Sequence, residues 1–576
     1  MSVISLQDVS WTYAGARKSA LEHLNLEVGK GEAILVTGPA GAGKSSLCYC
    51  LNGIVPNFFP GDLTGRIEVE GHDPSREEIG DLSRIVGAVL EDYGAQLLQP
   101  TVIDDVAFAL ENFGFDPRDI TSRVESAIQA VGLKGLEPRN PHTLSGGQQQ
   151  LCAIASVIAL VPGVYVLDEP ISSLDPLGGE MVSRFLRTLI EKREHTFVIV
   201  EQRVEEFIPW VDRIVAMRDG RIVEEGPPFE VLNDERRWER VRDAGVNLPQ
   251  LFLLAHDLRK KVDDGGRVDS LDPAAFPPRY IRALAGAMRS SHSRSEVPAD
   301  PPDVPAGDPI VCVEHLWHVY EGGTLALRDA NLIVHSGEML AIVGQNGSGK
   351  TTLLKHVNGL LRPTRGRVLV EGIDTNRSDP STLSRLAGLV FQHPDRQLFK
   401  LGVKDEVGLG MKRLGLQPEE RARRIADILK LVGLEHAATS ASFGLSLGER
   451  KRLALAAALS ADPKIILVDE PTTGQDLTMK LEIMDLLRTL NGSGKTIILV
   501  THDMDIVAKY ARRVVVMADG KVLLDGPTRE VLRRQDVLSR AHLKPPPVVA
   551  LSTLLSDETG VRATWLTTEE AVNAVG

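Results

Sequence analysis

The same series of motifs occurs twice in this chain, about 300 residues apart. The repeated segments are GPAGAGKSS and GQNGSGKTT (Gly38–Ser46, Gly344–Thr352), LSGGQQQLCAIA and LSLGERKRLALA (Leu144–Ala155, Leu445–Ala456), and VYVLDEP and IILVDEP (Val164–Pro170, Ile465–Pro471). The units of solenoid proteins are shorter, roughly 20 to 50 residues. A period this long therefore predicts a duplicated globular domain.

The two copies differ in length by one short insertion. The separation is 306 residues between Lys44 and Lys350 but 301 between Asp168 and Asp469. The first copy therefore carries five extra residues, which fall in the segment VPNFFPGDLT at 55–64. From Gly65 to Asp175 the copies align without a gap.

Each copy has the pattern of an α/β domain. Apolar runs such as residues 33–37 and 164–167 alternate with helical patterns, which predicts a parallel sheet covered on both faces. The predicted organisation is a first domain over 1–245 with an extension over 246–287, a linker over 288–308, and a second domain over 309–540 with an extension over 541–576. The linker assignment rests on its richness in Ser, Pro and Asp, which is typical of extended, solvated segments.

Both copies contain a glycine-rich loop of the pattern G-x4-G-K-[ST], which binds nucleotide phosphates through converging backbone N–H groups. The loop residues are Gly38, Pro39, Ala40, Gly41, Ala42, Gly43, Lys44, Ser45 and Ser46 in the first copy, and Gly344, Gln345, Asn346, Gly347, Ser348, Gly349, Lys350, Thr351 and Thr352 in the second. We expect Lys44 and Lys350 to reach the β and γ phosphates of ATP, and Ser45 and Thr351 to ligate Mg²⁺. A glycine-rich turn without a ligand is the alternative.

An apolar strand in each copy ends in two adjacent acids, Asp168-Glu169 and Asp469-Glu470. Beside a phosphate loop, the aspartate is placed to hold Mg²⁺ and the glutamate to orient or deprotonate the attacking water. An isolated acid at a strand end is usually just solvated, but the pairing recurs at similar separations in both copies. The sequence therefore predicts ATP hydrolysis with Mg²⁺.

The segment Leu144–Gln148, LSGGQ, resembles the signature of ATP-binding-cassette proteins and precedes the acidic strand as that family requires. The signature positions are Ser145, Gly146, Gly147 and Gln148 in the first copy and Ser446, Gly448 and Glu449 in the second. The resemblance implies two P-loop cassette domains, each with a mainly parallel sheet core, an antiparallel β subdomain and a helical signature subdomain. It also implies head-to-tail pairing, in which each ATP contacts the phosphate loop of one half and the signature of the other.

The resemblance assigns roles to further positions. Tyr13 and Tyr320 match an aromatic residue that stacks on adenine, although each could equally be a core tyrosine. Gln392 matches a glutamine that contacts Mg²⁺ and the attacking water, and His502 a switch histidine that bonds the γ-phosphate. The segments 172–175 and 473–476 match a loop that crosses between the halves. The implied catalytic set is Glu470, His502, Gln392 and Glu169.

The two predicted ATP sites are unequal. Glu91 stands opposite Gln392, Gln202 opposite His502, and Leu447 opposite Gly146. Gln202 cannot carry a positive charge, and Glu91 would place a negative charge near a polyanion. We therefore expect the second phosphate loop, paired with the unaltered signature, to carry most of the turnover. The alternative is that Glu169 suffices and both sites work comparably.

Among tandem cassettes, the chain most resembles the ATPase component of energy-coupling-factor transporters, which import vitamins, related micronutrients or transition-metal ions. The carrying features are Gln392–Leu398 (QHPDRQL) and the insertion Val55–Gly61. The resemblance implies an integral membrane coupling subunit and a substrate-binding membrane subunit as partners, with this chain peripheral on the cytoplasmic face. In the first copy Tyr93-Gly94 replaces Pro394-Asp395, which leaves its membrane contact open. Tails beginning at Leu248 and Pro545 resemble those that pack two such ATPases together, or are generic interface helices.

Composition argues against other classes. The formal charge of −13 and the acidic linker disfavour a nucleic-acid partner, and the four cysteines lack zinc-site spacing. No stretch approaches the roughly 18 apolar residues of a membrane span, and the N-terminal sequence does not resemble a secretory signal. A soluble tandem cassette acting on ribosomes or DNA, and a tandem sugar-importer ATPase, are the alternatives.

Overall fold

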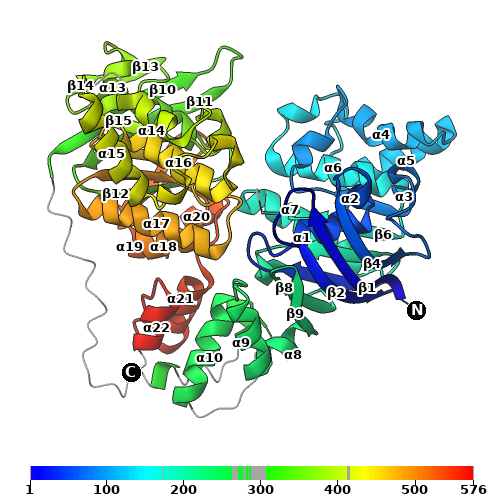
Figure 1. Ribbon diagram of the computed structural model, residues 1–576. Coiled ribbons are helices and arrows are strands. Elements are labelled where there is room, and N and C mark those ends of the chain that lie inside the picture. The colour runs from blue at the N-terminus through cyan, green and yellow to red at the C-terminus, as the bar shows by residue number, and fades with distance from the viewer. Residues whose placement is uncertain are drawn as a thin grey trace. The chain divides into compact units, whose positions relative to one another are not determined.

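The computed structural model describes residues 2–172, 174–262, 270–276, 281–282, 284–286, 288, 307–411 and 415–574. The chain divides into two compact units, Met1–Pro277 and Pro278–Gly576. Figure 1 shows their elements, with unit 1 coloured from blue to green and unit 2 from green to red. The division falls within the predicted extension 246–287, ahead of the predicted linker.

Unit 1 is built on a six-stranded sheet in the order β5-β6-β7-β3-β8-β9. Its strands are β3 (Ala33–Thr37), β5 (Val86–Val89), β6 (Val164–Asp168), β7 (Thr196–Val200), β8 (Arg213–Arg218) and β9 (Arg221–Gly226). All neighbours are parallel except β8 and β9. Every residue of β3, β6 and β7 is buried, so helices cover both faces of the central strands. The predicted parallel core is confirmed.

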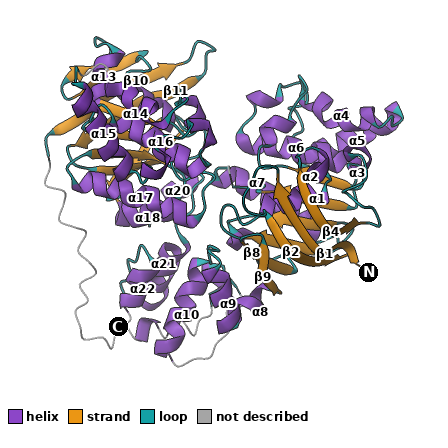
Figure 2. Ribbon diagram, in the orientation of Figure 1, coloured by secondary structure: helices purple, strands orange, loops and turns teal. Residues whose placement is uncertain are grey.

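Two smaller parts complete the cassette of unit 1, and Figure 2 distinguishes its strands from its helices. An antiparallel sheet contains β2 (Leu21–Gly29), β1 (Ser2–Tyr13) and β4 (Gly61–Val69). A helical part contains α4 (Val102–Asn112), α5 (Pro117–Ala130) and α6 (Gly146–Leu160), which pack on one another. The other helices are α1 (Lys44–Leu51), α2 (Ile54–Asn57), α3 (Ile79–Leu82), α7 (Pro176–Ile190), α8 (Pro228–Asn233), α9 (Glu235–Asp243) and α10 (Gln250–Val262).

Unit 2 repeats this architecture. Its main sheet has the order β15-β16-β17-β12-β18-β19, with β12 (Met339–Val343), β15 (Ala387–Val390), β16 (Ile465–Asp469), β17 (Thr496–Val500), β18 (Arg513–Ala518) and β19 (Lys521–Pro527). Its antiparallel sheet has β10 (Pro309–Val319), β11 (Leu325–His335), β13 (Arg365–Val370) and β14 (Ile373–Asp374). The helices are α12 (Lys350–Val357), α13 (Pro380–Leu386), α14 (Val403–Met411), α15 (Pro418–Leu431), α16 (Leu447–Leu459), α17 (Leu477–Gly492), α18 (Met504–Tyr510), α19 (Thr528–Val531), α20 (Gln535–Arg540), α21 (Pro547–Thr559) and α22 (Thr568–Ala574).

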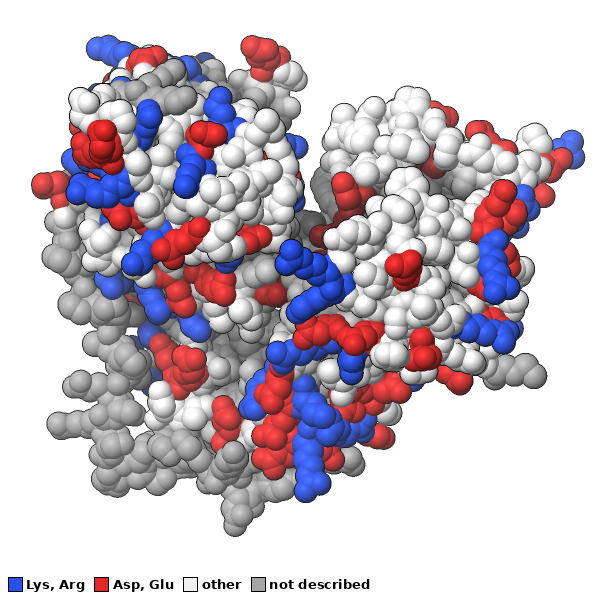
Figure 3. All heavy atoms as spheres, viewed as in Figure 1, with Lys and Arg blue, Asp and Glu red and all other residues white. Residues whose placement is uncertain are grey.

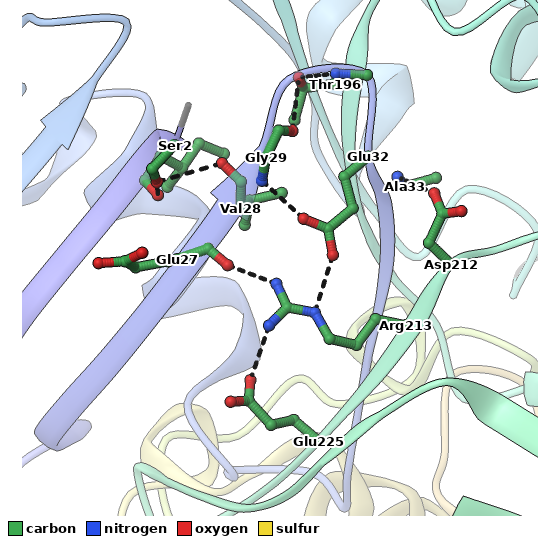
Figure 4. Close-up of polar contacts among 12 residues, drawn as sticks. Ser2, Glu27, Val28, Gly29, Glu32, Ala33, Thr196, Asp212, Arg213 and Glu225 are labelled. Atoms are coloured by element: carbon green, nitrogen blue, oxygen red, sulfur yellow. Dashed lines mark hydrogen bonds and ion pairs between the residues drawn. The ribbon is translucent and has the colours of Figure 1, made fainter. Parts of the chain in front are cut away.

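An arginine joins the two sheets of unit 1 at the edge where β3 begins (Figure 4). Arg213 on β8 pairs with Glu32 (Nε to Oε1, 2.9 Å) and Glu225 (Nη1 to Oε2, 3.2 Å) and donates to the carbonyl of Glu27 on β2. Arg513 does the same in unit 2 with Glu338 and Asp525. These networks lie at the opposite end of the central strand from the phosphate loop, so they fix the sheets without occupying the site.

The extensions are partly described. Apolar helices follow the Leu-Pro and Pro-Pro segments as α10 and α21. The predicted linker 288–308 lies outside the described residues except at its ends. In the part of the chain that the structure describes, no helix has the length and apolar character needed to cross a membrane.

Candidate functional site

Each phosphate loop connects a buried central strand to a helix. β3 ends at Thr37 and α1 begins at Lys44, whose ammonium donates to the carbonyls of Gly38 and Pro39, both at 2.9 Å. In unit 2, Lys350 donates to Gly344 (2.6 Å) and Gln345 (2.9 Å). Both lysines are buried. Each ammonium group thus bonds to the backbone of its own phosphate loop. From this position it can reorient to bind a phosphate.

The loop requires glycine at the helix start. Gly43 has φ of 98°, and a Cβ there would lie 2.3 Å from the carbonyl oxygen of Ala20. A side chain is therefore excluded both by the left-handed backbone and by the close approach of the β1–β2 connection. The backbone N–H groups at the start of α1 remain directed into the loop, where the helix dipole favours an anion.

Buried aspartates at the strand ends fit a Mg²⁺ ion. Thr351 donates its hydroxyl hydrogen to Asp469, at 2.9 Å from Oδ2 and 3.1 Å from Oδ1. Both carboxylate oxygens of Asp168 are buried, and the hydroxyl of Ser45 interacts with this carboxylate. Burial raises the pKa of Asp168 and of Asp469 to about 6. Each carboxylate would gain from a nearby cation, and Ser45 and Thr351 are the adjacent hydroxyl ligands.

The two glutamates predicted to be catalytic have different partners in the two units. His502 and Glu470 form a buried pair, with Nδ1 to Oε1 at 2.9 Å. Burial opposes ionisation, but His502 and Lys350 hold the pKa of Glu470 below its usual range. In unit 1 the amide of Gln202 donates to Oε1 of Glu169 at 2.7 Å. The contact is retained, but the group that can become positively charged is lost.

Unit 1 contains a further acid that the sequence analysis missed. Glu201 is fully buried, and its carboxylate accepts hydrogen bonds from the backbone N–H groups of Ile171, Gln202 and Arg203. Burial, followed by the charge of Glu169, raises its pKa to about 7. Thr501 is the corresponding residue in unit 2. The signal in the sequence that could have revealed this acid is the segment VEQR at 200–203, where the second copy has VTHD at 500–503.

Glu91 adds to this accumulation of negative charge. Desolvation raises its pKa to about 7, and the charges of Glu169 and Asp168 contribute in the same direction. Among the described residues, the first site therefore contains four carboxyl groups, Glu91, Asp168, Glu169 and Glu201. The second contains Asp469, Glu470 and Asp503, and Asp503 is paired with Lys480 at 3.0 Å. Gln392, the counterpart of Glu91, is half-buried at the end of β15.

Both signature segments keep the same helix start despite their sequence differences. Ser145 and Gln148 form a capping box on α6, and Ser446 and Glu449 form one on α16. Gly147 allows α6 to approach α7 closely, because a Cβ would lie 2.7 Å from the Cα of Gly178. The altered signature thus preserves the cap, while Leu447 and Glu449 change the shape and charge that it presents.

The two candidate adenine-stacking tyrosines each contact their own phosphate loop. The hydroxyl of Tyr13 lies 3.0 Å from Oγ of Ser46, and that of Tyr320 lies 3.0 Å from Oγ1 of Thr352. In unit 1 the insertion adds Phe59, whose ring packs edge-on against Tyr13 at 5.9 Å. Of the crossing loops, Ser173 lies outside the described residues.

The family model described as ABC transporter matches residues 21–172 and 327–473. An ABC transporter ATP-binding protein of Caldanaerobacter subterraneus subsp. tengcongensis is 38% identical over 578 residues, covering 99% of this chain and 98% of that protein. The chain belongs to the ABC transporter family. An ABC transporter ATP-binding protein of Methanosarcina acetivorans is also 38% identical, over 94% of this chain and 89% of that protein.

Two solved structures are similar in sequence to part of the chain. The cbiO1 protein of Clostridium perfringens, described as part of the ABC transporter complex cbiONQ, is 40% identical, with a TM-score of 0.38 over 42% of this chain and 97% of its own. A dimeric ABC cassette bound to ADP and phosphate is 33% identical, with a TM-score of 0.36 over 38% of this chain and 98% of its own.

ABC cassettes are ATPases that bind ATP with Mg²⁺, and this chain contains two of them. Within each ABC unit, the structure gathers the phosphate loop, the two strand-end acids, the switch residue and the tyrosine at the carboxyl edge of the main sheet. The signatures stand at the starts of α6 and α16, and their pairing across the two units stays a prediction.

Proposed function

We propose that this ABC ATPase powers substrate import through membrane subunits of the energy-coupling-factor type. In this proposal the chain is peripheral on the cytoplasmic face, and a coupling subunit and a substrate-binding subunit lie in the membrane. The proposal is supported by the QHPDRQL segment, the insertion after α1, and an exposed apolar surface that follows the first of these. The exposed apolar surface is the main support for the proposal.

The surface, called here the coupling patch, consists of Phe399, Leu401 and Phe443. Their exposed fractions are 73%, 77% and 53%. Ser442 donates its backbone N–H to the carbonyl of Leu401 at 2.7 Å, which brings the three side chains to one region of the helical part. Large apolar side chains that are exposed together, rather than singly, mark an interaction surface.

The position of the coupling patch links it to the ATP site. It begins seven residues after Gln392, on the segment that contains the 3₁₀ helix Pro394–Arg396. Gln397 fixes this segment, because its amide accepts from the N–H of Phe391 (3.1 Å) and donates to the carbonyl of Ala454 (3.0 Å). A membrane helix seated on the patch would therefore act on the backbone that carries Gln392. An apolar coupling helix is the partner that this surface fits.

Unit 1 offers a weaker version of the same surface. Its corresponding residues are Leu98, Pro100 and His142, of which only Leu98 is a large apolar side chain with a high exposed fraction, 66%. Gln96 accepts from the N–H of Leu90 as Gln397 accepts from that of Phe391, but its amide donates to Ala88 on β5 rather than to the helix that follows the signature. We infer that unit 2 makes the tighter contact with the membrane subunits.

A ribosome- or DNA-directed function has less support. On the face shown in Figure 3, basic and acidic side chains of the described residues are interspersed, with no continuous basic stripe. The coupling patch is also unsuited to a phosphate backbone, which is bound through clustered Lys and Arg. A sugar importer would use a related patch but lack the Pro-Asp-x-Gln segment.

The test replaces two residues of the coupling patch. Phe399→Asp with Leu401→Asp is expected to abolish co-purification of integral membrane proteins from detergent-solubilised membranes, because two charges would be buried against an apolar helix. ATP hydrolysis by the purified chain should stay within about twofold of wild type, since neither residue contacts the site.

The matched control changes the same positions in unit 1. Leu98→Asp with Pro100→Asp should weaken co-purification less than the unit 2 change does. Retention of membrane proteins by the Phe399/Leu401 variant would reject the patch, and co-purification of ribosomal proteins or DNA instead would reject the transport proposal.

We further propose that the second phosphate loop, with Gln392, Glu470, His502 and the unaltered signature, performs most of the hydrolysis. The four carboxyl groups of the first site and the uncharged Gln202 support this proposal. The first site would then bind ATP and hydrolyse it slowly.

A further inference from the structure

A buried lysine lies directly beneath the loop that follows the catalytic glutamate of unit 2. Lys451 on α16 is only 6% exposed, and its ammonium donates to the carbonyls of Pro471 (3.0 Å) and Thr473 (2.6 Å). These carbonyls come one and three residues after Glu470. We propose that Lys451 is a positioning residue for ATP hydrolysis, fixing the backbone that aims the carboxylate of Glu470. The inference rests on the proposed role of the second site.

The backbone at this point needs an external support. Glu470 has φ of 49°, a left-handed conformation that a non-glycine residue adopts only when its surroundings impose it. Within the loop, the hydroxyl of Thr473 and the amide of Gln475 are buried without hydrogen-bond partners among the described residues. These two side chains therefore do not fix the loop. Its backbone is held by the bonds from Glu470 to Val500 and from Gln475 to Thr472, and by the two bonds from Lys451.

The charge of Lys451 makes these bonds strong. Hydrogen bonds from an ammonium group are shorter and stronger than those between neutral groups. The surroundings of the side chain are apolar, with Leu455, Ile483 and Leu487 lining the same small cavity. Burial accordingly lowers the pKa of Lys451 to about 8, a shift that the charge of Glu470 opposes and that of Lys480 reinforces. The amine thus stays largely protonated at neutral pH, next to the carboxylate that it positions.

Unit 1 lacks this support. Gln150 occupies the position of Lys451 and is 1% exposed, but neither its amide nitrogen nor its amide oxygen has a hydrogen-bond partner among the described residues. The carbonyls equivalent to those of Pro471 and Thr473 belong to Pro170 and Ser172, which are both described. The two units therefore hold the backbone after the catalytic glutamate by different means, in addition to the differences at Glu91, Glu201 and Gln202.

The effect on rate should appear in kcat alone. In the full-length chain, Lys451→Gln is expected to lower kcat for ATP hydrolysis about tenfold, because a displaced general base weakens only the transition state. KM and the affinity for a fluorescent ATP analogue should stay within about twofold. Lys451→Met, which fills the apolar slot with a side chain of similar length, should give the same loss with an unchanged melting temperature. Gln150→Met is the matched control and should leave kcat within about twofold.

A double substitution tests whether Lys451 acts through Glu470. If it does, adding Lys451→Gln to Glu470→Gln should cause no further loss of turnover, because residues that act as a unit are not additive. Full additivity, a kcat unchanged by both Lys451 variants, or a loss matched by weaker ATP binding would each overturn the inference. If Glu470→Gln itself left turnover intact, the proposed assignment of the second site would fail instead.

Discussion

Replacing Glu470 with glutamine is expected to lower steady-state ATP hydrolysis by the whole chain about a thousandfold, whereas Glu169→Gln should lower it less than about threefold. Glu470 is buried, ionised and paired with His502, and it follows an aspartate that already contacts Thr351. Glu169 lies among three other carboxyl groups and is bonded to a neutral amide. Phosphate release from the two purified variants is the measurement.

Both variants should still bind ATP, because the substitutions leave Lys44, Lys350 and their loops in place. Nucleotide titration with a fluorescent ATP analogue therefore serves as the control for folding. Comparable losses of turnover from Glu470→Gln and Glu169→Gln would contradict the unequal-site proposal. They would instead support the alternative in which Glu169 is sufficient despite its altered neighbours.

Local features of the site could be predicted from the sequence because they depend on short segments. The strand at 33–37 was predicted and is observed as β3, with the same bounds. Glycine is required at position 43 because its φ is positive and because a Cβ there would collide with the carbonyl oxygen of Ala20. The capping boxes at Ser145 and Ser446 likewise need only residues one helical turn apart.

Features that depend on contacts between distant segments were missed. Lys451 looks like an ordinary helical lysine in LSLGERKRLALA, and only the fold shows that it faces the backbone after Glu470. Glu201 looks like a strand-end acid, which is normally solvated, yet it is fully buried against three backbone N–H groups. The exposure of three large apolar side chains could not be predicted either. Phe399, Leu401 and Phe443 are residue types that usually lie in a core, yet they are exposed on the surface.

The pairing of a phosphate loop with the signature of the other half depends on how the two units meet. That arrangement comes from the family resemblance, and it stays a prediction, as do the domain boundaries near the linker. The asymmetry between the sites does not depend on how the units meet. It rests on four residues within unit 1 that each differ from the residue at the same position of unit 2, namely Glu91, Gln150, Glu201 and Gln202.

Restoring the first site provides the converse of the first prediction. In a Glu470→Gln background, the further changes Glu91→Gln and Gln202→His are expected to raise turnover by roughly tenfold to a hundredfold. The single charge-assisted hydrogen bond from the new histidine contributes about 1.5–3 kcal/mol, and about 1.4 kcal/mol corresponds to a factor of ten in rate. Removing the Glu91 carboxylate, which would face a polyanion, acts in the same direction. The measurement is again phosphate release by the purified chain.

The gain should depend on Glu169, the predicted catalytic glutamate that remains in that background. Adding Glu169→Gln to the restored chain should therefore abolish it, and a gain that survives this change would show that the rate arises elsewhere. Turnover should also remain below wild type, because Gln150 supplies no ammonium group to the carbonyls of Pro170 and Ser172, and Glu201 still adds a buried carboxyl group. Adding Gln150→Lys to the restored chain that keeps Glu169 should then raise kcat again without changing KM. The new ammonium group would reach the carbonyls of Pro170 and Ser172, as Lys451 reaches those of Pro471 and Thr473 in unit 2.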